Sequence, residues 1–79
     1  MKAIYSRYRD GSEGIMTITA KEGSAKDIAH RARVISLLVE EWGYEDSVQE
    51  GDNEVTLGIG SDTIADAKWK YAQAKKSTK

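Results

Sequence analysis

Residues 23–43, GSAKDIAHRARVISLLVEEWG, carry the strongest secondary-structure signal in this chain of 79 residues. Ser24 followed by Asp27 is a variant of the helix capping box, and Gly43 is a natural helix stop. The stretch therefore predicts a helix over residues 25–42. Apolar side chains recur inside it at helical spacing, and the predicted buried stripe is Ile28, Ala32, Ile35, Val39 and Trp42.

Two predicted strands precede this helix in the sequence, and two more follow it. Residues 3–9 and 15–21 combine β-forming side chains with alternation, and the intervening residues 10–14 (DGSEG) favour a hairpin loop. After Gly43, residues 44–50 and 54–59 predict two further strands around the turn at residues 51–53.

Gly60-Ser61 then begins a second helix that is predicted to reach about Lys76, with Ile64, Ala67, Tyr71 and Ala74 as its apolar stripe. The order ββαββα predicts an α+β fold, a two-layer sandwich in which a four-stranded, mainly antiparallel sheet carries both helices on one face. We expect residues 1–76 to form a single domain and residues 77–79 to be a frayed tail. The open sheet face is expected to carry Tyr5, Arg7 and Arg9, or their neighbours, beside Thr17, Thr19 and Lys21.

Charge is segregated along the chain although the formal total is only −1. Residues 1–33 contain seven basic and four acidic side chains, residues 34–60 contain seven acidic and no basic ones, and residues 61–79 contain five basic and two acidic ones. Surface charge of this kind selects what can dock on a protein. The pattern therefore informs on partners more than on fold.

The charged side chains of the predicted helix at residues 25–42 are placed unfavourably for its macrodipole. Lys26, Arg31 and Arg33 lie in its first half, whereas Glu40 and Glu41 lie in its last turn. Each misplaced exposed charge costs about 0.3–1 kcal/mol. Leu37 falls on the polar side of this helix, and Trp69 falls off the stripe of the second helix, so each is either covered by a neighbouring element or presented to a partner.

The residues that catalysis and metal binding require are scarce. The chain has one histidine, His30, on the polar side of the first helix, and it has no cysteine. We therefore predict neither an enzyme nor a cofactor, and no metal site. The absence of cysteine and of an apolar segment long enough to cross a membrane favours a cytoplasmic protein that does not insert into membranes.

Binding remains as the function class. We predict a small non-enzymatic protein-interaction module, an inhibitor or regulator, that docks an acidic surface between Glu40 and Glu54 on a basic partner. If the partner binds nucleic acid, these carboxylates would take the place of phosphates. Small inhibitors encoded by phages and mobile elements often have this size and charge, which is an analogy between classes of protein. The predicted contact residues are Leu37, Glu40, Glu41, Trp42, Tyr44, Glu45, Asp46, Glu50 and Asp52.

Two alternatives stay open. The first hairpin and the lysine-rich C-terminal helix suit a nucleic-acid-binding protein, because exposed aromatic rings stack on bases and cations hold phosphates. The residues for that role are Tyr5, Arg7, Arg9, Lys21, Lys68, Trp69, Lys70, Lys75 and Lys76. The other alternative is a symmetric homodimer, in which the acidic middle of one copy meets the basic ends of another.

Overall fold

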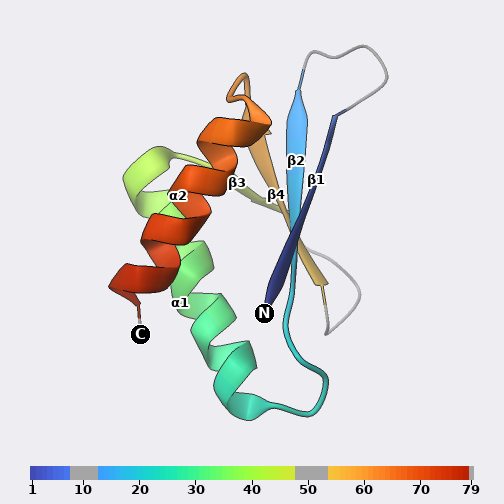
Figure 1. Cartoon of the computed structure of the whole chain (residues 1–79), viewed down its shortest axis with the longest axis vertical. Helices are drawn as coiled ribbons and strands as arrows, with labels where there is room; N and C mark the ends of the chain where they lie inside the picture. The colour runs from blue at the N-terminus through green and yellow to red at the C-terminus, as the bar shows by residue number, and fades with distance from the viewer. Residues whose placement is uncertain (8–12, 48–53, 79) are drawn as a thin grey trace.

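The computed structural model describes residues 1–7, 13–47 and 54–78. Within these residues an antiparallel sheet contains β1 (Lys2–Arg7), β2 (Gly14–Thr19), β3 (Glu45–Ser47) and β4 (Glu54–Gly60), in the spatial order β1-β2-β4-β3. Figure 1 shows α1 (Ala25–Trp42) and α2 (Ile64–Ser77) on the same side of this sheet. The predicted α+β sandwich and its ββαββα order are confirmed.

The strand register decides which side chains face the helices. Thr17 of β2 pairs with Ile4 of β1 on one side and with Thr56 of β4 on the other. Residues that pair across strands share a face, so these side chains lie on the face opposite the helices. The prediction had left the face of the β1 side chains open, and the structure puts Lys2, Ile4 and Ser6 on the open face, while Tyr5 and Arg7 lie on the helix side.

The core lies between the sheet and the two helices. Its largest fully buried side chains are Met16, Ile18, Val34, Leu38 and Leu57. They come from β2, β4 and α1, and α2 adds Ala67, Tyr71 and Ala74. The predicted stripe of α2 is therefore confirmed apart from Ile64, which is half-buried. Neither helix of the described residues is long and apolar enough to cross a membrane.

Both ends of α1 form where the local sequence predicts them. Ser24 accepts a hydrogen bond from the amide of Asp27 at 3.2 Å, and Gly43 adopts the left-handed conformation with φ 68°. The Asp27 carboxylate does not return the bond to Ser24. It accepts one from the Lys21 amide at 2.6 Å and forms an ion pair with the amino group of Met1 at 3.0 Å.

The buried stripe of α1 differs from the prediction. Arg31, Val34, Ile35 and Leu38 are buried, whereas Ile28 is 39% exposed. α1 packs against α2 as well as the sheet, and this second contact moves the buried arc toward Val34 and Leu38. The apolar periodicity of one helix does not tell where its neighbour lies, so the sequence could not show this shift.

The predicted ends of several other elements are wrong, and cap formation explains two of them. β3 begins after Tyr44, because the Tyr44 amide bonds to the carbonyl of Leu38 at 3.3 Å and so completes the end of α1. α2 begins after Thr63, which forms a capping box with Asp66, rather than after Ser61. Among the other ends, β2 ends at Thr19, β4 includes Gly60 and α2 includes Ser77, while the predicted end of β1 at Arg9 lies outside the described residues.

One of the charges that oppose the macrodipole of α1, that of Arg33, has a structural explanation. Arg33 donates from Nε to the carbonyl oxygen of Thr78 at 3.3 Å, and His30 hydrogen-bonds to the Thr78 hydroxyl at 3.1 Å. Thr78 is the C-cap of α2, so both side chains lie at the negative end of that helix. The predicted tail thus includes a residue that holds the two helices together, and Lys79 lies outside the described residues.

Candidate functional site

The carboxylates that the sequence singled out lie where α1 ends and β3 begins, but they do not share one face. Glu45 pairs with Gly58 and Asp46 pairs with the buried Leu57, so these two side chains lie on opposite faces of the sheet. Glu40 and Glu41 occupy the last turn of α1, and Glu45 and Asp46 open β3 across the Gly43 turn. All four side chains are exposed, and none forms an ion pair or hydrogen bond with another described residue. We call these four residues the acidic patch. Glu50 and Asp52, predicted to belong to it, lie outside the described residues.

An aromatic pair borders the acidic patch. The rings of Trp42 and Trp69 meet edge to face, with centroids 6.3 Å apart and an interplanar angle of 70°. Trp42 is half-buried and packs against the core, whereas Trp69 is 59% exposed. The question left open for Trp69 is answered in favour of presentation at the surface. Leu37 is half-buried against the core and offers less apolar surface than the prediction assumed.

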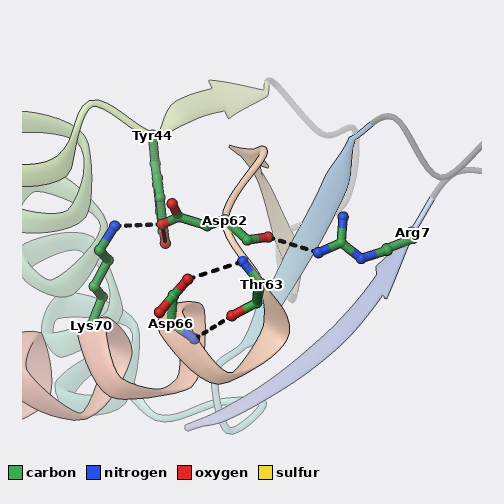
Figure 2. Close-up of polar contacts among 6 residues, drawn as sticks. All are labelled: Arg7, Tyr44, Asp62, Thr63, Asp66 and Lys70. Carbon is green, nitrogen blue, oxygen red and sulfur yellow. Dashed lines mark hydrogen bonds and ion pairs between the residues drawn. The ribbon is translucent and has the colours of Figure 1, made fainter.

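Tyr44 is a core residue rather than a surface anchor, because only 5% of it is exposed. Its hydroxyl donates to Oδ2 of Asp62 at 2.7 Å, and the Lys70 ammonium forms an ion pair with the same carboxylate oxygen (Figure 2). Arg7 donates to the backbone carbonyl of Asp62 at 2.8 Å. Asp62 therefore joins Tyr44 after α1, Lys70 in the middle of α2 and Arg7 at the end of β1.

The electrostatics of this cluster follow from its contacts. The Lys70 ammonium, followed by the Tyr44 hydroxyl, holds the pKa of Asp62 below its ordinary value. Burial, followed by the hydrogen bond to the Asp62 carboxylate, raises the pKa of Tyr44 well above its ordinary value of 10.0. At neutral pH Asp62 is thus ionised and Tyr44 is protonated, which are the states that the hydrogen bond requires.

The two buried tyrosines make a matched pair for testing this cluster. Tyr71 is also buried, which raises its pKa to about 12, but no described residue bonds to its hydroxyl. We expect Tyr44→Phe to lower the free energy of unfolding by about 1 kcal/mol and Tyr71→Phe to leave it unchanged or raise it. Urea unfolding followed by circular dichroism measures both.

The Tyr44→Phe effect has a defined pH dependence. The lowered pKa of Asp62 means that its contacts stabilise the fold above the ordinary carboxyl pKa and weaken as the pH falls through the lowered value. The difference between the wild type and Tyr44→Phe should therefore narrow below about pH 4. Equal losses in both tyrosine variants at neutral pH would show that the hydrogen bond to Asp62 does not stabilise the fold.

A pocket of about 290 Å³ lies beside this cluster. It is lined by Trp42, by three acidic residues, Glu13, Glu45 and Asp62, and by residues 58–61. Among its carboxylates, Glu13 and Glu45 are exposed and form no ion pair with described residues, while Asp62 is held by Lys70. A negative rim next to an indole ring suits a cationic side chain. Sequence periodicity could not find Glu13 or Asp62, because both reach the pocket from loops.

The residues predicted for nucleic-acid binding do not form one surface. Tyr5 is half-buried under Lys68, whose Nζ lies 5.8 Å from the ring centroid. Lys70 is paired with Asp62, and Trp69 belongs to the acidic end of the molecule. Arg7 bonds to the Asp62 backbone, and Arg9 lies outside the described residues.

The remaining basic residues of that set lie at the opposite end of α1. One pocket contains Lys21 with Lys26 and Arg33, and a second contains Lys75 with Lys76. His30 lines both pockets, so they adjoin. The molecule thus has a basic end near the start of α1 and an acidic end near its finish.

No protein-family model, no curated protein and no solved structure matches this chain. Inferences about its function therefore depend on the geometry and charge described above.

Proposed function

We propose that this protein is a small non-enzymatic interaction module that docks its acidic patch on a basic partner protein. The observation that carries the proposal is a run of four exposed carboxylates around the end of α1, Glu40, Glu41, Glu45 and Asp46, together with the contact there between Trp42 and the exposed Trp69. Charged residues form rims around apolar anchors in protein interfaces, and tryptophan is enriched among the anchors.

The energetics of α1 support a binding role for the patch. The C-terminal end of a helix is negative, so Glu40 and Glu41 each cost about 0.3–1 kcal/mol there when exposed. No basic residue lies in the last turn to offset them. Residues that oppose folding locally are often retained for function. A cationic partner surface would relieve this repulsion.

The partner is defined by its chemistry. It carries lysine or arginine side chains that meet the acidic patch, and one cationic side chain can enter the pocket between Glu13, Trp42 and Glu45. Surfaces with this charge are typical of proteins that bind nucleic acid. Docking there would cover the partner's phosphate-binding groups, so the protein would act as an inhibitor or regulator. We place this role in the cytoplasm. Small inhibitors from phages and mobile elements provide the analogy for it.

The test compares two carboxylates that differ in position and not in charge. Glu45→Gln removes a charge from the patch, whereas Glu22→Gln removes one from the exposed turn before α1. Binding of a short arginine-rich peptide is measured by calorimetry and by NMR shift perturbation. We expect Glu45→Gln to weaken binding about two- to fivefold, and Glu45→Gln with Asp46→Asn about three- to tenfold.

Glu22→Gln should leave peptide affinity nearly unchanged, and the perturbed amides should cluster around Trp42 and Glu45. Equal weakening by Glu22→Gln would mean that the peptide senses net charge alone. That result would contradict a localised docking surface.

Nucleic-acid binding is the second candidate, and the adjoining pockets that share His30 support it. Titration of labelled single-stranded and duplex nucleic acid at two salt concentrations tests it. Binding that is tight and steeply salt-dependent, and that Lys26→Gln weakens, would favour this candidate over protein docking.

A further inference from the structure

The outward face of α1 is exposed, and within the described residues Arg33 on this face bonds to Thr78 at the end of α2. Its exposed side chains include Lys26, Ala29, Arg33, Ser36 and Glu40. On a helix with 3.6 residues per turn these positions fall on one side, opposite the buried Val34 and Leu38. Figure 1 shows α1 crossing α2 in the layer beside the sheet, and α1 contacts both α2 and β3.

This face is self-complementary. Lys26 and Glu40 are separated by 14 residues, about 21 Å along the helix axis, and their midpoint, Arg33, lies at the middle of α1. A twofold axis perpendicular to the helix at its middle therefore brings Lys26 of each copy opposite Glu40 of the other, which gives two equivalent contacts. The side chains between these two positions are mostly small, Ala29, Ala32 and Ser36, so two helices can approach closely.

The macrodipole gives a second, independent reason. Lys26 at the positive end and Glu40 at the negative end both oppose the dipole of their own helix. In an antiparallel pair the two dipoles run in opposite directions, so each of these charges lies beside the end of the partner helix that favours it. The arrangement that is unfavourable in one copy becomes favourable in two.

We propose that α1 pairs antiparallel with α1 of a second copy of this chain about a twofold axis near Arg33, with reciprocal contacts between Lys26 and Glu40. Arg33 lies near the axis, where the two like charges reduce the affinity, and its Nε bonds to the carbonyl oxygen of Thr78. The pocket beside Trp42 lies beyond the end of the paired segment and stays accessible. The inference goes beyond the proposed docking function and does not depend on it, but both use Glu40, so a second copy and a docked partner would compete for that carboxylate.

The dimer is expected to be weak and dependent on concentration. α1 has 18 residues and is about 27 Å long, so one helix pair covers less area than a standard protein interface. Sedimentation equilibrium of the full chain from about 10 µM to 1 mM covers the range in which such an interface associates. High salt should weaken the association, because both contacts are exposed ion pairs.

Charge reversal tests the pairing directly. In Lys26→Glu and in Glu40→Lys, two attractive contacts of the dimer become two repulsive ones, and self-association should weaken about tenfold or more. An equimolar mixture of the two variants should associate again, since the mixed dimer has an attractive pair at both contacts. A reciprocal antiparallel pairing of these two positions predicts this recovery on mixing.

Loss of folding would not explain weaker self-association of the two variants. Each reversal matches the macrodipole of its own helix, so the thermal midpoint of the dilute monomer should stay the same or rise in both variants. A wild type that remains monomeric at about 1 mM would overturn the proposal. It would also be overturned if the mixture associated no more than the separate variants, or if each variant associated as strongly as the wild type.

Discussion

Replacing Leu38 with alanine is expected to lower the free energy of unfolding by about 2–5 kcal/mol and to leave the domain marginally folded. Leu38 is fully buried and belongs to the cluster that joins α1, α2 and the sheet. A chain of this length has only about 4–12 kcal/mol of stability in total. The cavity left by the lost side chain removes contacts with all three neighbours at once. Urea unfolding followed by circular dichroism measures the loss.

The adjacent Leu37 provides a control of identical chemistry. It is half-buried at the edge of the same core, so Leu37→Ala should cost about 1 kcal/mol or less. Comparing the two losses of stability also tests which face of α1 packs on the core. The sequence pattern alone placed neither leucine on the predicted buried stripe. Similar losses in both variants would mean that α1 presents a different face to the core.

Replacing Trp69 with alanine is expected to weaken binding of the arginine-rich peptide about tenfold or more with little effect on stability. Trp69 is 59% exposed, and its closest described aromatic partner is Trp42 at 6.3 Å. Its contact with Trp42 at the end of α1 gives a cationic side chain of the peptide an exposed aromatic surface. Calorimetry measures the affinity, and urea unfolding measures the stability.

Two further variants separate binding from folding. Trp69→Phe keeps a ring at the surface and should retain most of the affinity, whereas Trp42→Ala should also destabilise the fold, since Trp42 packs against the core. If Trp69→Ala destabilised the domain and left peptide binding unchanged, its ring would be a packing residue. The proposed docking surface would then lose its apolar anchor.

The sequence predicted those parts of the fold that depend on local signals. Both predicted ends of α1 were correct because its caps, Ser24 and Gly43, are the residues directly next to the helix in sequence. The start of α2 was wrong because two candidate caps follow one another, and only Thr63 has an acidic residue, Asp66, three positions later. Local patterns identify an element reliably and its end less so.

The candidate site was predictable only in part. Charge counting located Glu40, Glu41, Glu45 and Asp46, because they are close in sequence. Tyr44 looked like a surface anchor since its partner, Asp62, follows 18 residues later in a loop. Glu13 enters the same pocket from the other half of the chain. Contacts of this kind depend on strand order, which periodicity does not determine.

Strand order also has a consequence for how fast this protein folds. The central pair, β2 and β4, joins the two ββα halves, and its Thr17–Thr56 contact spans 39 residues. Closing a loop of that length must precede most of the stabilising sheet contacts, so contact order predicts slower folding than for a helical bundle of equal size. Each half alone exposes the inner edge of a two-stranded ribbon, which is marginal in water. The two halves should therefore gain their native structure in one kinetic step.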